Sequence, residues 1–310
     1  MINLQDMDIL HGAQFSREEL ERIMDVADMF RSQLETHPSL DFLHGYVLAT
    51  LFFEPSTRTR LSFETAMHRL GGSVVGFSSA ESTSVAKGET LEDTVRTVDQ
   101  YVDFIAIRHP ALGSADRAAE IAQAPVLNGG DGAGQHPTQA LLDLYTLRSE
   151  CGHIDGTTLV ICGDLKNGRT VHSGVDVYKH YQMRLVFVAP EQLRMPVEIT
   201  SRLKSLGIQF EETDDLAGAL KKADVLYMTR IQKERFADVN EYERLKDSYI
   251  LTRQMVENIN PNLVTLHPLP RVSEIATDVD TLPGAAYFRQ AKNGVYIRMA
   301  LLALIAGKIQ

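Results

Sequence analysis

Several features that mark particular protein classes are scarce or absent in this sequence. Hydrophobic residues make up 44% of its 310 residues, yet no run approaches the ~20 consecutive apolar residues of a membrane-spanning helix. The chain contains only two cysteines, Cys151 and Cys162. They are too few for a disulfide framework or a cysteine metal cluster, and they indicate a reducing, cytoplasmic location. The first residues lack the basic and apolar regions of a secretory signal, so we expect no cleaved leader.

Positive charge is also in deficit. The chain carries 31 Lys+Arg against 41 Asp+Glu, a formal net charge of −10. A net-acidic surface argues against nonspecific binding of nucleic acid or of a membrane. An anionic ligand would therefore need a local concentration of arginine.

The common signatures of covalent and metal catalysis are missing as well. The sequence has no Gly-x-Ser-x-Gly elbow and no histidine pair at metal-ligand spacing, and neither cysteine lies in a recognisable triad. We therefore expect no metal and no cofactor. Catalysis would depend on positioning and on electrostatic stabilisation.

Apolar strands alternate with amphipathic helices along the whole chain, and the pattern restarts near residue 150. The expected strands are 46–53, 73–77, 104–107, 125–127, 157–162, 184–189, 208–211, 225–228 and 263–266. Such alternation is typical of parallel, doubly wound sheets. We predict an α/β protein with two such domains, residues 1–149 and 150–287. A long C-terminal helix, about 288–310, is predicted to pack back on the first domain.

Three polar connections interrupt this pattern. Residues 78–88 are Ser-rich and contain Lys87, and residues 128–135 form a Gly-rich turn. The charged stretch 232–247 is expected to be a mobile loop with helical pieces.

The segment 56–60, Ser-Thr-Arg-Thr-Arg, lies where an apolar strand feeds an amphipathic helix. A helix N-terminus carries partial positive charge and unpaired N–H groups, so Arg58 and Arg60 should destabilise it when no anion is bound. One interpretation is a Ser56 N-cap flanked by solvated arginines. The alternative, which we favour, is a cradle for a phosphate or an oxyanion.

More cationic and polar residues follow other predicted strands. They are Arg108, His136, Arg169, Arg230 and the segment 267–271. In open parallel sheets, ligands bind outside the carboxyl ends of the strands. So many cations at these ends of an acidic protein predict substrates with at least two or three negative charges.

The loop 163–170 is one substitution away from the phosphate-loop pattern, with Arg169 in the position of the lysine. A noncatalytic nucleotide- or phosphometabolite-binding protein is thus one alternative. Because that lysine is missing, we favour an Arg169 that grips a carboxylate in a bidentate manner.

Taken together, the motifs resemble the signature of the aspartate/ornithine carbamoyltransferase family. The matching segments are 56–60, 108–110, 136–139 and 267–271, in the same order and over nearly the whole chain. Ornithine enzymes typically carry a His-Cys-Leu-Pro segment, whereas Pro268 stands in place of that cysteine here. The segment 230–234 also resembles the family's aspartate-binding loop. An ornithine enzyme is the weaker alternative, since a cationic acceptor would need acidic residues in place of Arg169 and Arg230.

The resemblance implies an activity: transfer of the carbamoyl group of carbamoyl phosphate to L-aspartate, in pyrimidine (UMP) biosynthesis. The implied carbamoyl-phosphate contacts are Ser56, Thr57, Arg58, Thr59, Arg108, His136, Gln139, Pro268 and Leu269. Among these, the implied catalytic residues are Arg58, Thr59, Arg108 and His136. The implied aspartate contacts are Lys87, Arg169, Arg230 and Gln232.

The family resemblance also implies a homotrimer with shared active sites. Lys87, and with it Ser84 or Ser82, would reach the phosphate site of a neighbouring chain. The loop is shorter here than in the familiar enteric form, so the choice between the two serines stays open. The sequence also leaves open whether regulatory chains or a dihydroorotase-like partner join the trimer.

Overall fold

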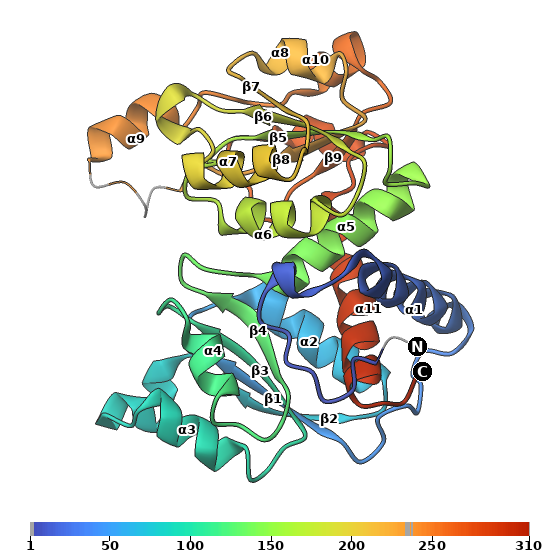
Figure 1. Cartoon of the computed structure of the whole chain (residues 1–310), viewed down its shortest axis with the longest axis vertical. Helices are drawn as coiled ribbons and strands as arrows, with labels where there is room; N and C mark the ends of the chain where they lie inside the picture. Colours follow the sequence, from blue (N-terminus) through green and yellow to red (C-terminus); the bar gives the residue numbers. More distant parts are fainter. Residues whose placement is uncertain (1–2, 233–235, 237, 310) are drawn as a thin grey trace. The chain divides into compact units, whose positions relative to one another are not determined.

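The structure, a computed structural model, describes residues 3–232, 236 and 238–309. The chain divides into two compact units (Figure 1). Unit 1 comprises Met1–Leu142 with Lys292–Gln310, and unit 2 comprises Asp143–Ala291. The divide falls within helix α5, Pro137–Cys151.

Unit 1 is built on a four-stranded sheet in the order β2-β1-β3-β4. Its strands are β1 Val47–Phe52, β2 Ser73–Phe77, β3 Phe104–His109 and β4 Val126–Asp131, and all of them pair in parallel. The other helices of this unit are α1 Arg17–Thr36, α2 Thr57–Arg69, α3 Leu91–Val98 and α4 Ser114–Ala119. Helix α1 starts at a capping box, in which Ser16 accepts from the Glu19 N–H and Glu19 accepts from the Ser16 N–H.

Unit 2 is built on a five-stranded sheet in the order β7-β6-β5-β8-β9, which is also parallel. Its strands are β5 Thr158–Cys162, β6 Arg184–Val188, β7 Phe210–Thr213, β8 Val225–Met228 and β9 Val264–Leu266. Its helices are α6 Arg169–Tyr178, α7 Val197–Ser205, α8 Leu216–Leu220, α9 Val239–Leu245 and α10 Arg253–Ile259. The prediction of two doubly wound parallel sheets is confirmed.

The C-terminal helix α11, Tyr287–Ile305, returns to unit 1, as predicted. Arg298 on this helix donates from Nη2 to Thr138 Oγ1 at 3.0 Å, and its guanidinium lies 4.8 Å from the ring centroid of Phe63 on α2. The Asp6 N–H donates to the Ile305 carbonyl at 3.0 Å, which joins the two ends of the chain. None of the helices in the described part of the chain has the length and apolar character needed to span a bilayer.

The structure corrects several sequence predictions. Strand β4 runs to Asp131, although residues 128–135 were predicted to form a turn. The glycines serve close packing here, because a Cβ on Gly129 would lie 3.1 Å from the Ile107 carbonyl oxygen of β3. The connection 78–88 contains two 3-10 turns, Ala80–Ser82 and Ser84–Lys87, and α10 had no predicted counterpart.

Candidate functional site

In unit 1, strand register brings two of the predicted motifs together. Phe52 at the end of β1 is the register partner of Arg108 near the end of β3. The ladder continues one residue further, where the Phe53 N–H donates to the Arg108 carbonyl at 2.9 Å. The segment that enters α2 therefore begins beside Arg108, at the carboxyl edge of the sheet.

Arg108 is held in a fixed orientation. Its side chain is 10% exposed, and it donates from Nη1 to the Gly129 carbonyl at 3.1 Å and from Nη2 to Glu54 Oε1 at 2.7 Å. The carboxylate of Glu54 is 34% exposed. A buried guanidinium with two fixed acceptors is pre-organised for a ligand that contacts its remaining face.

The start of α2 concentrates positive charge. Ser56 occupies the N-cap position, but its side chain makes no capping hydrogen bond, so the interpretation of Ser56 as a simple cap lacks its defining contact. The first turn contains no acidic residue. Partial burial, and then the charge of Arg108, lower the pKa of Arg58. An anion placed here would relieve that repulsion and would also meet the free N–H groups of the helix start.

The two arginines of the segment 56–60 have different roles. Arg60 Nη1 lies 3.3 Å from Glu64 Oε1, one turn further along the same helix. Arg58 makes no hydrogen bond or ion pair among the described residues. Arg58 is therefore the arginine of this segment that is available to a ligand.

Two predicted oxyanion donors from different helices meet beside this cluster. Thr59 Oγ1 in α2 and His136 Nε2, just before α5, lie 3.5 Å apart, and both residues are buried. The first turn of α5 also carries Gln139, whose N–H donates to the His136 carbonyl at 3.0 Å. A Cβ on Gly129 would lie 3.4 Å from Thr59 Cγ2, so the strand that anchors Arg108 also packs against Thr59.

Lys87 and Ser84 lie in the connection between β2 and α3. Both are exposed, at the two ends of the turn Ser84–Lys87, which stops at Gly88 with a left-handed φ of 95°. The side chain of Ser82 lies outside the described part of the chain. Exposure of Lys87 and Ser84 at a surface turn is compatible with the predicted reach into a neighbouring chain.

In unit 2, the two arginines that are predicted to bind the substrate aspartate follow two adjacent strands. Arg169 starts α6 after β5, and Arg230 follows β8. Strands β5 and β8 are paired, and the Thr229 N–H donates to the Cys162 carbonyl at 2.8 Å. Gln232 Nε2 lies 3.4 Å from the Asn167 carbonyl, so the two loops are in contact. The neighbouring motif residues Lys233 and Glu234 lie outside the described residues.

A glycine permits this contact between the loops. Gly163 has a φ of +123°, and a Cβ there would lie 2.3 Å from the Thr229 carbonyl oxygen. Any side chain at position 163 would therefore push apart the loops that carry Arg169 and Arg230.

The loop 163–170 differs from a phosphate loop in its hydrogen bonding. The Asp164 carboxylate accepts from the Asn167 N–H at 3.0 Å and from its side-chain amide at 3.1 Å. Burial raises the pKa of Asp164, and these hydrogen bonds oppose the rise. A buried acid occupies the N–H group of Asn167 at the centre of this loop, which disfavours the nucleotide-binding alternative.

The segment 267–271 follows β9 and has an unusual backbone. Leu269 adopts a left-handed φ of 55°, a conformation that costs a non-glycine residue about 1–3 kcal/mol. Its N–H donates to His267 Nδ1 at 2.7 Å. Arg271 at the end of the segment is bound by the carboxylate of Asp280 and by the Tyr287 hydroxyl, and so has a structural role.

The partners of His267 were not predicted from the sequence. His267 Nε2 lies 2.7 Å from Glu274 Oε1, and the His267 N–H donates to Gln290 Oε1 at 2.8 Å. Both partners are buried. The sequence shows an acid and an amide downstream of the motif histidine, at positions 274 and 290, but their spacing is not distinctive enough to identify them as its partners.

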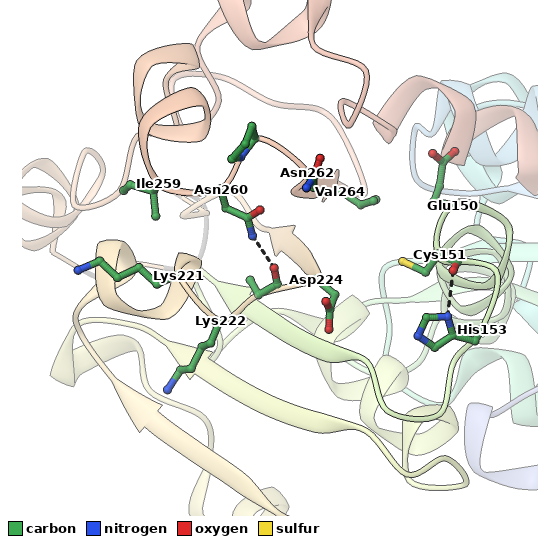
Figure 2. Close-up of a pocket in the computed structure, with 12 residues that line it drawn as sticks. Glu150, Cys151, His153, Lys221, Lys222, Asp224, Ile259, Asn260, Asn262 and Val264 are labelled. Atoms are coloured by element: carbon green, nitrogen blue, oxygen red, sulfur yellow. Dashed lines mark hydrogen bonds between the residues drawn. The ribbon is translucent and has the colours of Figure 1, made fainter.

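A groove of about 500 Å³ also lies in unit 2 (Figure 2). Its lining includes Asp224, just ahead of β8, and Asn260 after α10, so it opens near the amino ends of the strands. Asp224 accepts from the Thr158 N–H at 2.7 Å, and Asn260 donates to the Ala223 carbonyl at 2.6 Å. None of the predicted site residues lines this groove. Among the described residues, no group of three or more His, Cys, Asp or Glu side chains could hold a metal ion.

Comparison with known families matches both halves of the chain. The aspartate/ornithine carbamoyltransferase model for the carbamoyl-P binding domain matches residues 7–149, and the model for the Asp/Orn binding domain matches residues 155–305. An aspartate carbamoyltransferase catalytic subunit from Thermococcus kodakarensis is 54% identical over 300 residues, which cover 97% of each chain.

Solved structures agree with these matches. The catalytic subunit of aspartate transcarbamoylase from M. jannaschii superimposes with a TM-score of 0.91 at 48% identity, covering 97% of this chain and 98% of that one. The aspartate transcarbamoylase of Trypanosoma cruzi, in complex with carbamoyl aspartate and phosphate, superimposes with a TM-score of 0.92 at 40% identity, covering 97% of each chain.

The parallel sheets, the cationic strand ends and these matches define one class of protein. The chain belongs to the aspartate/ornithine carbamoyltransferase family. The relatives and the solved structures named above are all aspartate enzymes, which confirms the resemblance to the aspartate branch of the family.

Proposed function

We propose that the chain transfers the carbamoyl group of carbamoyl phosphate to the amine of L-aspartate. The products are N-carbamoyl-L-aspartate and phosphate, an early step of pyrimidine (UMP) biosynthesis. The observation that carries the proposal is the arrangement in unit 1. Arg108, fixed by Glu54, adjoins a helix start whose unpaired cation is Arg58. This arrangement is suited to a dianionic phosphate.

The phosphate of carbamoyl phosphate is bound at the α2 start, in this proposal. Its oxygens accept hydrogen bonds from the hydroxyls and N–H groups of the segment 56–59 and from the Arg58 and Arg108 guanidinium groups. The proposed phosphate contacts are Ser56, Thr57, Arg58, Thr59 and Arg108.

The carbamoyl group is oriented by donors and acceptors of opposite kinds. Thr59, Arg108 and His136 donate to its carbonyl oxygen, and Gln139 with the carbonyls of Pro268 and Leu269 accepts from its amine. The pairing of Thr59 with His136 at 3.5 Å supports this grouping, because one small acceptor atom can receive hydrogen bonds from both.

The reaction then needs no protein nucleophile. The neutral amine of aspartate attacks the carbamoyl carbon, and the carbonyl oxygen becomes an oxyanion that the three donors stabilise. The carbon–oxygen bond to phosphate breaks, and the departing phosphate takes the amine proton. Removal of one such oxyanion donor commonly lowers kcat by about 10²–10³-fold.

Aspartate brings two carboxylates to the acceptor site. Arg169 and Arg230, from the contacting loops of unit 2, with Gln232, are the proposed partners. Lys87 contributes from a neighbouring chain. This set disfavours ornithine, whose side-chain cation would be repelled by both arginines.

We also propose that the chain forms a homotrimer with shared active sites in the cytoplasm, and that regulatory chains can associate with it. The exposed Lys87 and Ser84 support the sharing, and the two free cysteines support the compartment. Native mass spectrometry tests the trimer. Mixing inactive Lys87→Gln and Arg58→Ala chains tests the sharing, because about a quarter of the randomly formed sites would regain both residues. A mixture that stays inactive would contradict the sharing.

The acceptor specificity is tested with aspartate and ornithine as substrates in parallel assays. Formation of carbamoyl aspartate with one phosphate per product, and no citrulline, supports the proposal. Citrulline as the main product would contradict the proposal and would identify ornithine as the acceptor.

A further inference from the structure

The imidazole of His267 makes two hydrogen bonds that fix its chemical state. Its Nδ1 lies 2.7 Å from the Leu269 backbone nitrogen, whose N–H can only donate. Nδ1 must therefore be the acceptor, and the ring proton must sit on Nε2. Nε2 in turn lies 2.7 Å from Glu274 Oε1, a carboxylate that accepts. The ring is neutral, in the Nε2–H form.

Both members of this pair are shielded from water. The side chains of His267 and Glu274 are 1% and 6% exposed. The second carboxylate oxygen, Glu274 Oε2, accepts from the Val272 N–H at 3.1 Å. The Glu274 carboxylate thus binds both the His267 ring, before the turn, and the Val272 N–H, after it.

A buried chain of hydrogen bonds anchors the other side of His267. Gln290 Oε1 accepts from the His267 N–H at 2.8 Å, and Gln290 Nε2 donates to Asp143 Oδ1 at 2.6 Å. The Tyr227 hydroxyl donates to Asp143 Oδ2 at 2.8 Å. The histidine is thereby tied to strand β8 and to Asp143, in the part of helix α5 that belongs to unit 2.

The turn between these anchors has the left-handed Leu269, with φ of 55°. Leucine rarely adopts this conformation, and the hydrogen bond from its N–H to His267 Nδ1 is the contact that opposes its relaxation. The conformation determines the directions of the Pro268 and Leu269 carbonyls. Those carbonyls are the proposed acceptors for the carbamoyl amine.

We propose that His267 and Glu274 are positioning residues that make the enzyme select a carbamoyl phosphate over an acyl phosphate. Glu274 fixes the imidazole tautomer, the imidazole fixes Leu269, and the two carbonyls then accept the N–H groups of the carbamoyl amine. The inference rests on the proposed function, which assigns those carbonyls to that amine.

Acetyl phosphate separates this role from general stability, because its methyl group replaces the amine and donates no hydrogen bond. The measurement is the Kd for carbamoyl phosphate, acetyl phosphate and inorganic phosphate, by calorimetry on the full chain. His267→Leu removes the acceptor. His267→Asn supplies an oxygen that can accept from the N–H two residues on, and Glu274→Gln keeps an acceptor for Nε2–H.

We expect His267→Leu to lose about 10-fold of the preference for carbamoyl phosphate over acetyl phosphate, with the Kd for phosphate unchanged within about twofold. His267→Asn and Glu274→Gln should retain most of the preference. Asp176→Asn is the control, since Asp176 is a buried acid paired with Arg202 at 2.6 Å elsewhere in unit 2. It should lower the melting temperature and leave the preference intact.

The inference is overturned if His267→Leu raises the Kd for carbamoyl phosphate and for acetyl phosphate by the same factor, or if neither Kd changes. If His267→Leu does not fold, the preference for carbamoyl phosphate can be compared between Glu274→Ala, which removes the acceptor for Nε2–H, and Glu274→Gln, which keeps it. A wild-type chain that shows no preference for carbamoyl phosphate and makes no carbamoyl aspartate would contradict the proposed function itself. That outcome differs from a failure of the inference alone, in which the wild type prefers carbamoyl phosphate and the variants keep the same preference.

Discussion

Glu54 Oε1 lies 2.7 Å from Arg108 Nη2. This ion pair joins the segment that follows β1 to a guanidinium near the end of the neighbouring strand β3. The Glu54–Arg108 ion pair offsets a repulsion between two arginines. Partial burial, and then the charge of Arg108, lower the pKa of Arg58, so the two arginines repel each other when no anion is bound. Glu54 holds Arg108 in place against that repulsion.

Replacement of Glu54 by Gln should therefore disturb catalysis more than folding. The amide keeps an oxygen acceptor but loses its charge, and a hydrogen bond between charged groups is worth about 1.5–3 kcal/mol. We expect kcat/KM for carbamoyl phosphate to fall about 10–100-fold, measured with aspartate saturating. The control is Glu64→Gln, which removes the same charge from the pair with Arg60. Equal, small effects of the two substitutions would contradict the role of Glu54.

Removal of the Arg58 side chain should abolish turnover and spare the fold. The guanidinium has no hydrogen-bonding or ion-pair partner among the described residues, and a cation at a helix start is unfavourable by a few tenths of a kcal/mol. Arg58→Ala should thus keep or slightly raise the melting temperature while kcat/KM falls by at least about 10²-fold. Arg60→Ala is the matched control, with a loss of less than about 1 kcal/mol of stability and near-normal binding of phosphate. A near-normal rate in Arg58→Ala would refute the cradle.

The contact between the loops of β5 and β8 can be tested at Gly163. The new methyl group of Gly163→Ala would lie 2.3 Å from the Thr229 carbonyl oxygen, so the loops that carry Arg169 and Arg230 must separate. We expect a higher KM for aspartate, by about 10-fold or more, and a loss of about 2 kcal/mol or more in stability. Binding of carbamoyl phosphate should change little. Gly207 also has a positive φ, of +70°, but nothing lies within 4 Å of an added Cβ, so Gly207→Ala should lower stability without an effect on the KM for aspartate.

The His267–Glu274 pair predicts a particular dependence of stability on pH. Burial is the largest single influence and would raise the pKa of Glu274, but His267 and the backbone N–H groups of Val272 and Glu274 together outweigh burial and leave the pKa below its usual 4.5. A pKa that is lower in the folded state stabilises the protein above the unfolded value, and this stabilisation is lost as the pH falls through the folded value. The difference in melting temperature between wild type and Glu274→Gln should be largest near neutral pH and should shrink below about pH 4.5. A difference that widens on acidification would contradict this assignment.

The sequence predicted the elements whose signals are local. The Ser-x-x-Glu spacing of Ser16 and Glu19 is a local signature of the box that caps α1, and Arg108 lies near the end of β3, just after the predicted strand 104–107. The cationic strand ends were identifiable because the register of a parallel sheet brings its carboxyl ends to one edge.

Long-range pairs could not be predicted in the same way. Nothing in the local pattern links Glu54 to Arg108 or Glu274 to His267, since each pair depends on how separate segments pack. The first part of β4 was predicted as the strand 125–127, but its second part, 128–131, was mistaken for a turn because glycine is rare in strands. Here Gly129 permits the close approach of β3. Arg58 and Arg60 were equivalent by composition, and only the helix geometry assigns Arg60 to Glu64.

Carbamoyl transfer to aspartate by positioned residues, without a protein nucleophile, leaves no covalent intermediate on the enzyme. Its most direct test is a single-turnover assay of the purified chain with ¹³C-carbamoyl phosphate and L-aspartate, followed by NMR. We expect the label in N-carbamoyl-L-aspartate with one equivalent of phosphate, no enzyme-bound carbamoyl group when aspartate is omitted, and no product from Arg58→Ala. A labelled enzyme without aspartate, or labelled citrulline in place of carbamoyl aspartate when both acceptors are present, would contradict this expectation.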